Sequence, residues 1–473
     1  MITQGDTGRT VPLNPDELHE RLAAAVATPD ADELEIAVLA RAGEYTRFAG
    51  DVVHQPQDIT EVQYLVRAVV DGNAFRTATT TGEGLTRAVR TAAAGARERA
   101  RLVGSAGTAA HPAPTGRNAP AAEELPDEVL WFDDVAGFDR TARVSAARDA
   151  MRQAAVVDGE AAGMFGRAVV QQAVAGSAGG LRLTAATEAY GALTVTVADG
   201  TSHWVDLSRS AERLRLAGAV DDAVALAARS RGRTPLEAGT YPVVLGPEAV
   251  GEFLQFLPEL GFSGELAAAG IGVAATRPGQ QVVSEAVEVA DDARADVGLP
   301  IGFDIEGTTK RRVPLIEHGR VGRPVTDRAT AQALGTVPTG HAHIAREQVP
   351  APEAANIVMA AGDADEQDLL AGVEDGVYIQ RFWYTRLVDR TTGTITGVTR
   401  DACFRIEGGR LTRPLDGMRF TESVLRVLSG VTGIGRERRA QPVMNVWNGA
   451  TTAPAVRAEA FRLGAAPEGR GRL

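Results

Sequence analysis

The chain has 473 residues, of which 44% are hydrophobic, and its 49 Lys and Arg against 61 Asp and Glu give a formal net charge of −12. This length predicts two or three domains with a substantial core. The acidic balance argues against nucleic acid or an anionic membrane as the main partner, because both attract basic surfaces.

Two chemically important residue types are almost missing. Lys310 is the only lysine and lies outside any Gly-Lys-Ser/Thr sequence, so a phosphate-binding P-loop is excluded. Cys403 is the only cysteine, which excludes an intrachain disulfide and a cysteine-rich metal site. Residues 1–16 lack the pattern of a signal peptide, and the weakly apolar run 266–275 is too short to cross a bilayer. We therefore expect a soluble cytoplasmic protein that makes no contact with membranes.

The first half of the chain alternates helical and β-rich patterns. Apolar residues at helical spacing predict helices over residues 16–27, 83–102, 140–157 and 211–230. Asp199-Gly200 between two β-rich runs predicts a hairpin. Residues 104–126 are rich in Ala, Pro and Gly and predict a linker-like loop. The β-rich runs, which we expect to form an antiparallel meander and hairpins, are 36–41, 45–49, 62–70, 74–80, 165–174, 181–187, 193–197 and 203–207.

The second half is dominated by β-rich runs. Helices are predicted only at about 248–257 and 422–429. The sequence therefore predicts an α+β protein with an N-terminal mixed α/β domain over residues 1–235. A β-dominated C-terminal domain, a large antiparallel sheet or a barrel-like body, is expected over residues 236–473. Its expected strands are 301–305, 312–317, 356–360, 376–383, 393–398 and 402–407.

Few residues carry a recognisable chemical pattern. A zinc-binding helix needs two histidines about one turn apart. The only His-Glu pair, His19-Glu20, is not followed by a second histidine one turn later. His341 and His343 would face one side of a strand, where a shared metal or a structural role is open. Glu248 and Glu252 lie one turn apart on a predicted helix, as an acid/base pair or as a solvated face.

Aromatic residues and arginines gather near residue 383. Strand alternation would place Trp383 and Thr385 on one face and Phe382, Tyr384 and Arg386 on the other. Core packing and a peptide-binding groove both fit this pattern. The candidate peptide-binding residues are Arg381, Trp383, Tyr384 and Arg386. Cys403, between Ala402 and Phe404, is expected to be a buried, inert thiol.

Several segments, taken in order, resemble the TldD/PmbA family of peptidase-related proteins. The resemblance covers nearly the whole chain and rests on the order and spacing of the segments. They include Thr46-Arg47-Phe48-Ala49 with Val53-His54-Gln55, Ala175-Gly176-Ser177-Ala178-Gly179, Tyr241-Pro242-Val243-Val244-Leu245, Gly302-Phe303-Asp304-Ile305-Glu306-Gly307, Thr339-Gly340-His341-Ala342, Asn356-Ile357-Val358 and Ile406-Glu407-Gly408-Gly409.

The resemblance implies a non-catalytic subunit. Catalytic members of the family carry a zinc-binding HExxxH helix after the equivalent of residues 241–245 and a cysteine near the C-terminus. Here residues 246–257 contain no histidine and residues 433–452 contain no cysteine. This pattern resembles the TldE/PmbA branch, which pairs with a zinc-bearing TldD subunit that cleaves unfolded or modified peptides. We expect no metal or other cofactor in this chain, zinc in such a partner, and a structural role for His341.

Two alternatives remain open. The chain is a stand-alone peptide hydrolase with a relocated or metal-free site, built from Glu248, Glu252, His341 and His343, or it is a peptide-binding maturation scaffold. Self-association in place of a heteromer is likewise left open by the sequence.

Overall fold

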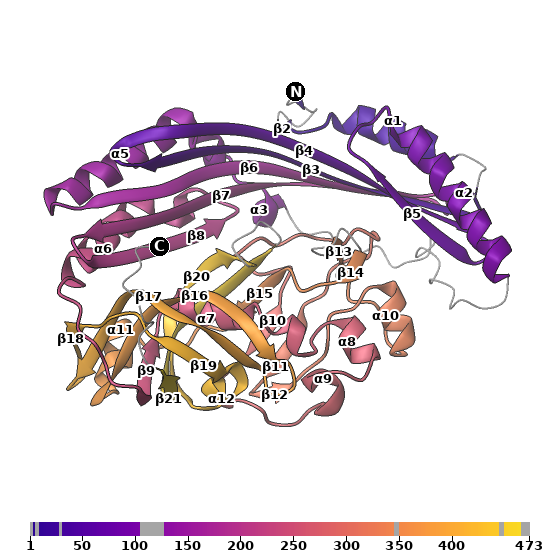
Figure 1. Cartoon of the computed structure of the whole chain (residues 1–473). Helices are drawn as coiled ribbons and strands as arrows, with labels where there is room; N and C mark the ends of the chain where they lie inside the picture. Colours follow the sequence, from indigo (N-terminus) through magenta and orange to yellow (C-terminus); the bar gives the residue numbers. More distant parts are fainter. Residues whose placement is uncertain are drawn as a thin grey trace.

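The computed structural model describes residues 3–4, 9–27, 31–104, 127–344, 350–443 and 449–464. The predicted loop at 104–126 lies, after Gly104, outside the described residues. A six-stranded sheet uses residues up to Ser208, and an eleven-stranded sheet begins at Gly239. The first sheet arches over the body that contains the second (Figure 1). This is the α+β class that the sequence predicts.

The first sheet has the strand order β5-β4-β3-β6-β7-β8, with all neighbours antiparallel. A two-stranded ribbon of β1 (Thr3–Gln4) and β2 (Thr10–Val11) precedes it. The six strands are β3 (Glu33–Ala49), β4 (Val52–Val70), β5 (Asn73–Thr79), β6 (Glu160–Gly176), β7 (Leu181–Val197) and β8 (Gly200–Ser208).

Helices cover the outer face of the first sheet, because the strands alternate apolar and polar residues. On β3, Leu34, Ile36 and Val38 pack under the first two helices, while Glu35 points toward the second body. Figure 1 shows α1, α2 and α5 on the face turned away from that body. The helices of this half are α1 (Pro15–Val26), α2 (Leu85–Val103), α3 (Asp127–Leu130), α4 (Asp134–Gly137), α5 (Arg140–Val156) and α6 (Leu216–Arg229), the last preceded by the 3₁₀ turn η1 (Glu212–Leu214).

The second sheet closes partly on itself. Its order is β12-β11-β10-β15-β21-β19-β17-β16-β9, and β9 also pairs with β21, which closes five strands into a ring. β18 pairs with β17, and β20 pairs with β21. Its strands are β9 (Gly239–Leu245), β10 (Val289–Asp291), β11 (Val313–Glu317), β12 (Arg320–Val321), β15 (Asn356–Met359), β16 (Asp375–Asp389), β17 (Thr394–Glu407), β18 (Arg410–Pro414), β19 (Arg419–Ser423), β20 (Val431–Pro442) and β21 (Ala450–Leu463).

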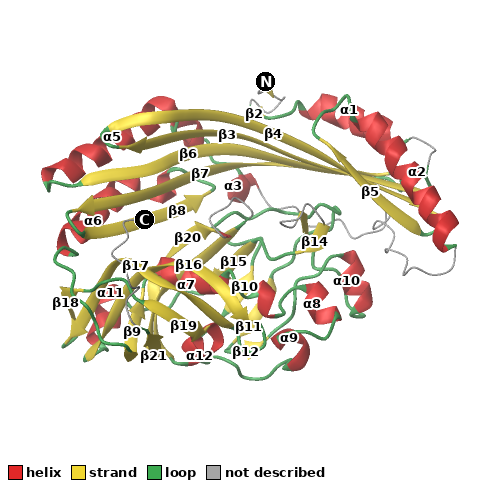
Figure 2. Cartoon of the chain, in the orientation of Figure 1, coloured by secondary structure: helices red, strands yellow, loops and turns green. Residues whose placement is uncertain are grey.

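Aromatic rings fill the space between α7 and the ring of strands. Phe253 of α7 stacks on Phe382 at 5.2 Å between ring centroids, and Phe382 lies 5.5 Å from Phe461. Short helices and a small hairpin complete the body (Figure 2). They are α7 (Pro247–Leu254), η2 (Pro258–Leu260), α8 (Gly264–Ala268), α9 (Val273–Thr276), α10 (Arg328–Ala333), α11 (Glu366–Ala371), α12 (Val424–Ser429), and β13 (Ala342–Ile344) with β14 (Pro350–Pro352).

Several sequence predictions differ from the structure. The expected strand at 301–305 is a turn, in which Asp304 Oδ1 accepts hydrogen bonds from Glu306 N and Thr308 N. The runs 36–41 and 45–49 belong to the single strand β3, whose Gly43 lies under the ring of Tyr45. The second sheet is not purely antiparallel, because β16 runs parallel to β9 and β15 runs parallel to β21.

Other predicted bounds differ as well. The runs 181–187 and 193–197 both belong to β7, the runs 393–398 and 402–407 both belong to β17, and the helix predicted at 211–230 begins at Leu216. Three helices and one hairpin agree closely. The helices at 16–27, 83–102 and 140–157 and the hairpin at Asp199-Gly200 are present within two residues of their predicted bounds. No helix in the described part of the chain is long and apolar enough to span a membrane.

Candidate functional site

Helix α7 lies at the junction of the two bodies. Gly246 precedes it, and its N–H donates to Ile379 O at 2.8 Å. A Cβ at this glycine would lie 2.8 Å from Gln380 O, so the close approach of β16 requires glycine. Pro247 occupies the first turn, where its missing N–H leaves no helical bond unmade. Ala249, Val250, Phe253 and Leu254 enter the core, and Glu248 and Glu252 fall together on the opposite side.

Glu248 is held by a histidine and an arginine from distant strands. Its Oε2 lies 2.7 Å from His203 Nδ1 on β8, and its Oε1 lies 3.6 Å from Arg439 Nη1 on β20. Burial alone would raise the pKa of Glu248, but the charge and hydrogen bond of His203, together with Arg381 and Arg439, lower it. Glu248 is therefore an ionised carboxylate fixed between the two bodies.

Glu252 has the opposite electrostatic setting. Its Oε1 accepts a hydrogen bond from Thr385 Oγ1 on β16. Burial raises the pKa of Glu252, and the hydrogen bonds from Thr385 and Gln255 offset this only in part. The two carboxylates of α7 thus differ in their tendency to hold a proton, although they lie one turn apart.

Gln380 connects this helix region to the first sheet. Its Oε1 accepts from His203 N at 3.1 Å and Ala402 N at 3.2 Å, and its Nε2 donates to His203 O at 2.7 Å. The oxygen and the nitrogen of this amide therefore both hold β8 against β16. Sequence reasoning missed Gln380 and Arg439 entirely and gave His203 no role, because no local pattern reveals partners so far apart in the chain.

The predicted aromatic and arginine segment lies next to α7. Arg381 pairs with Asp401, and the guanidinium carbons of Arg381 and Arg400 lie 5.0 Å and 4.7 Å from the centre of the Trp383 ring. Tyr384 is 70% exposed, and Arg386 lies over its ring at 4.7 Å. The four candidate peptide-binding residues are thus neighbours in space.

The predicted alternation along this segment is wrong at Tyr384. Phe382 is buried in the core while Tyr384 is exposed, so the two side chains do not share a face. The register with β17 shifts between Trp383 and Arg386, and Tyr384 has φ +59°. This β-bulge turns the Tyr384 ring outward.

His341 lies in a separate buried cluster. Its Nε2 is 2.8 Å from Asp291 Oδ1, and its Nδ1 is 3.0 Å from both Thr339 O and Thr339 Oγ1. Burial, and next the charge of Lys310, lower the pKa of His341. Asp291 Oδ2 also accepts from Ala355 N and Asn356 N, so the cluster fixes the start of β15. His341 therefore holds the fold together here and makes no contact with Glu248 or Glu252.

His343 and Cys403 are likewise placed apart from α7. The Nδ1 of His343 donates to Ile344 O at 2.9 Å, so the two histidines are not directed at one metal. Cys403 is buried in β17, as predicted, and burial raises its pKa to about 11. Such a thiol is unreactive.

The residues of α7 do not fit a zinc site. When the HExxxH pattern is set on Pro247-Glu248-Ala249-Val250-Gly251-Glu252 with Glu248 at its glutamate, Pro247 and Glu252 stand at the two histidine positions. Proline has no donor atom, and Glu252 is engaged by Thr385. Within the described ranges no group of three or more His, Cys, Asp or Glu side chains is arranged to hold a metal. The position of Glu248 and Glu252 within the HExxxH spacing was visible in the sequence, but sequence reasoning did not recognise it.

Comparison with known proteins agrees with this architecture. Residues 238–465 match the family model of the PmbA/TldA metallopeptidase C-terminal domain. The chain is 27% identical over 206 residues to a metalloprotease of Methanothermobacter thermautotrophicus, which covers 44% of this chain and 45% of that protein. It is 26% identical over 212 residues to the zinc metalloprotease TldD homolog of Saccharolobus solfataricus, which covers 44% and 46%. The chain thus spans about half the length of the curated relatives it matches.

Solved structures share the whole fold. TldE from Thermococcus kodakarensis superimposes with a TM-score of 0.81 at 18% identity, over 95% of this chain and 100% of that one. A Thermotoga maritima protein described as a candidate modulator of a DNA gyrase gives a TM-score of 0.79 at 17% identity, over 95% and 100%.

The fold and the matched C-terminal segment define a metallopeptidase-related protein. Residues 238–465 belong to the TldD/PmbA family, and the whole chain has the fold of TldE.

Proposed function

We propose that this chain is a non-catalytic, TldE/PmbA-like partner subunit of a TldD-type zinc metallopeptidase that cleaves unfolded or modified peptides. The observation that carries the proposal is helix α7, where proline and glutamate stand at the two histidine positions of HExxxH. The glutamate that remains, Glu248, is bound to His203 and Arg439. Its Oε1 has no hydrogen-bond partner among the described residues, but α7 has no histidine pair to hold the metal-bound water on which the glutamate of an HExxxH enzyme acts.

The role of this chain in such a complex would be to bind the peptide. The exposed Tyr384, the half-buried Trp383 and the adjacent Arg381 and Arg386 offer aromatic faces and charge to an extended chain. Strand pairing is a second way to hold a peptide. Val377 to Ile379 pair with strands on both sides, so this part of β16 has no free edge. β9 pairs with β16 only as far as Ile379, and no described strand pairs with the later residues of β16 on that side. This edge is therefore the favoured place for a peptide strand.

Peptide cleavage by the reconstituted complex tests this binding role. Trp383→Ala and Tyr384→Ala are expected to raise the KM for an unfolded peptide about tenfold, because each aromatic contact contributes on the order of 1–2 kcal/mol. Val388→Ala is the matched control, since Val388 is 59% exposed on the same strand. Unchanged KM values in both aromatic variants, with an intact complex, would show that the peptide binds elsewhere.

Subunit pairing is tested by co-expression with a zinc-bearing TldD homologue. We expect the two chains to co-purify and to cut peptides that neither cuts alone. A stable homodimer of this chain with its own peptidase activity would contradict the proposal.

The same proposal places the complex in the cytoplasm and divides the chain into domains at 1–235 and 236–473.

A stand-alone peptide hydrolase is the second candidate. The observation in its favour is the opposite pKa shift of Glu248 and Glu252, which suits a base and an acid one turn apart. In that case the purified chain cleaves peptide without added metal, and Glu252→Gln lowers kcat at least a hundredfold. Absence of cleavage by the wild-type chain alone rules this candidate out.

A further inference from the structure

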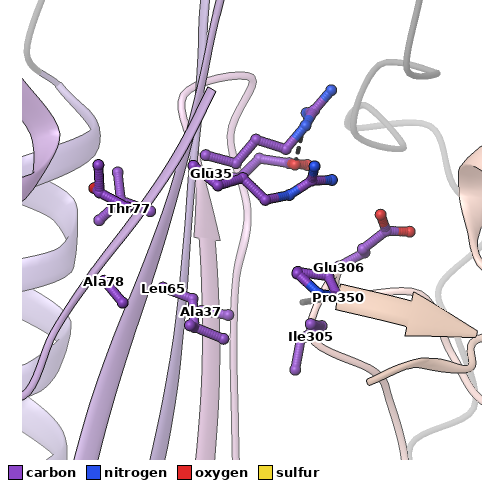
Figure 3. A pocket seen from close by; sticks show the side chains of 11 residues that line it. Glu35, Ala37, Leu65, Thr77, Ala78, Ile305, Glu306 and Pro350 are labelled. Atoms are coloured by element: carbon purple, nitrogen blue, oxygen red, sulfur yellow. Dashed lines mark hydrogen bonds and ion pairs between the residues drawn. The ribbon is translucent and has the colours of Figure 1, made fainter. Parts of the chain in front are cut away.

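A cavity of about 230 Å³ lies where the first sheet meets the second body, away from α7. Figure 3 shows Glu35, Ala37 and Leu65 on the sheet side of this cavity, across from Ile305, Glu306 and Pro350. Pockets for drug-sized ligands measure roughly 300–1,000 Å³, so this one suits a smaller group.

Two arginines line this cavity side by side. Glu35 on β3 is in register with Arg67 on β4, and Arg67 is in register with Arg76 on β5. Like charges directly opposite each other across two strands destabilise a sheet. An anion beside the pair would relieve this repulsion.

Arg67 presents an unused hydrogen-bonding edge. Its Nη1 donates to Glu35 Oε2 at 2.8 Å. Its Nε and Nη2 are buried and have no acceptor among the described residues. The whole residue is only 6% exposed. These two N–H groups form the edge of a guanidinium that binds a carboxylate through two parallel hydrogen bonds. Leaving buried donors unpaired is costly, which points to a ligand.

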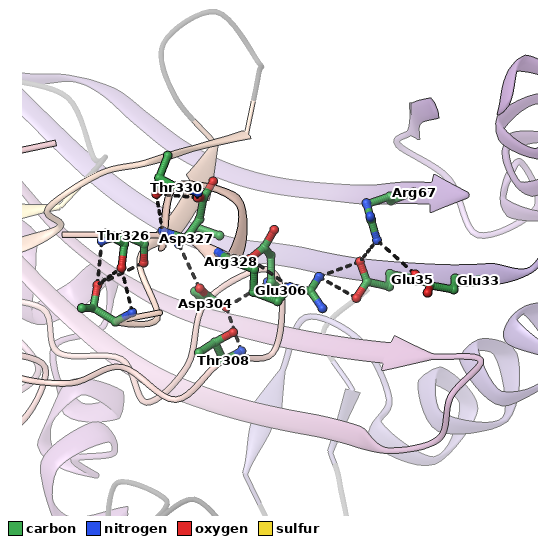
Figure 4. A network of polar contacts seen from close by, with 12 residues as sticks. Glu33, Glu35, Arg67, Asp304, Glu306, Thr308, Thr326, Asp327, Arg328 and Thr330 are labelled. Atoms are coloured by element: carbon green, nitrogen blue, oxygen red, sulfur yellow. Dashed lines mark hydrogen bonds and ion pairs between the residues drawn. The ribbon is translucent and has the colours of Figure 1, made fainter. Parts of the chain in front are cut away.

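The carboxylates around the cavity already have donors. Arg328 Nη2 lies 2.6 Å and 2.7 Å from the two oxygens of Glu35, and Arg328 Nε lies 3.1 Å from Glu306 Oε2 (Figure 4). Asp327 accepts from Thr330 N and Oγ1 at the start of α10. Arg76, which is exposed, forms no ion pair with a described residue. Most acceptors are therefore in use here; the exception is Glu33 Oε2, which has no hydrogen-bond partner among the described residues and lies 3.9 Å from Arg67 Nη1.

Apart from Thr77, the rest of the cavity wall is apolar. Ala37, Leu65, Ala78, Ile305 and Pro350 line it. We propose that this cavity binds the carboxylate end of a small aliphatic ligand, whose chemistry is that of the C-terminal residue of a peptide. Arg67 grips the carboxylate, Arg76 attracts it at the exposed side, and the apolar wall receives the side chain. The inference rests on the proposed function in taking the ligand to be a peptide end.

Calorimetry on this chain alone tests the proposal and is independent of any zinc subunit. The probe is N-acetyl-alanyl-valine with a free carboxylate, compared with its C-terminal amide and with acetate. We expect the free acid to bind with a Kd on the order of 1 mM or tighter and the amide at least about tenfold more weakly. Acetate, which lacks the side chain, should also bind at least about tenfold more weakly.

Three variants complete the test. Arg76→Gln removes the exposed charge and Ala78→Leu fills the cavity, and both positions are exposed, so the fold is retained. Each is expected to weaken binding of the free acid at least about fivefold, while the exposed Arg90→Gln on α2 leaves it unchanged. The proposal is overturned if the free acid does not bind at a concentration of ~10 mM, which is about ten times the expected Kd. It is also overturned if the amide or acetate binds equally well, or if both cavity variants bind like wild type. Failure here would leave subunit pairing, which is measured by co-purification, untouched.

Discussion

Asp206 is a carboxyl group near α7 whose pKa is raised by its surroundings. Its Oδ1 accepts from Leu207 N at 2.9 Å and from Ala440 N at 3.1 Å, which ties β8 to β20. Burial raises the pKa of Asp206 to about 7, although the charge of Arg439 opposes the shift. A carboxyl group that titrates near neutrality therefore lies in the same junction as the ionised Glu248.

Asp206→Asn is predicted to flatten the pH dependence of stability. An unfolded aspartate has a pKa near 3.9, so between about pH 4 and 7 the folded state keeps a proton that the unfolded state releases. Stability from this group is thus present at low pH and is lost as the pH rises toward 7. The variant should gain on the order of 2 kcal/mol over wild type at pH 8 relative to pH 5.

Urea unfolding of both proteins at the two pH values measures this difference. Glu437→Gln, a charge removal at an exposed position of β20, is the control and should follow wild type. An Asp206→Asn protein with the same pH slope as wild type would show that Asp206 is ionised at pH 5.

At the scale of elements, the sequence predicts what local spacing determines. Apolar residues at helical spacing located α1, α2 and α5, and Asp199-Gly200 located a hairpin. The pairing of β9 with β21, which closes the ring, joins segments some two hundred residues apart and leaves no local trace. The bulge at Tyr384 was missed for a related reason, since tyrosine is not a residue that favours positive φ.

Tyr384→Gly separates the two roles of that bulge. A non-glycine residue at φ +59° is strained, so glycine should stabilise the free protein by up to ~1 kcal/mol even though the contact between Arg386 and the ring is lost. Because the exposed ring is proposed to bind peptide, affinity should fall about tenfold in the same variant. Thermal unfolding and peptide binding by fluorescence anisotropy measure the pair. Lower stability together with unchanged affinity would mean that the ring serves the fold.

At the scale of the whole molecule, side chains of one body bind the backbone of the other. Gln172 Nε2 donates to Phe303 O at 2.8 Å, and Arg182 Nη1 donates to Gly307 O at 2.9 Å. Gln380 does the same from the second body to β8. The candidate site is also built from both bodies, since His203 belongs to the first and Glu248 to the second. Sequence reasoning identified the two carboxylates of α7 but had no means to find the partners that neutralise one of them.

Arg328→Gln is predicted to destabilise the chain by about 3 kcal/mol. Arg328 is buried and neutralises Glu35 of the first sheet and Glu306 of the second body, and both carboxylates would lose that partner. Chemical unfolding measures the loss. Arg101→Gln, which removes an exposed ion pair with Glu98, should cost less than 0.5 kcal/mol, a typical value for a surface pair. Equal effects of the two substitutions would mean that the pairs between the bodies contribute little.

The zinc content of purified proteins tests the central claim most directly, because that claim is the loss of the metal site from α7. Mass spectrometry of metals on this chain, purified alone and together with a TldD-type subunit, provides the measurement. The account predicts no stoichiometric zinc on the isolated chain and one zinc per pair of subunits in the complex. One tightly bound zinc per isolated chain would contradict it.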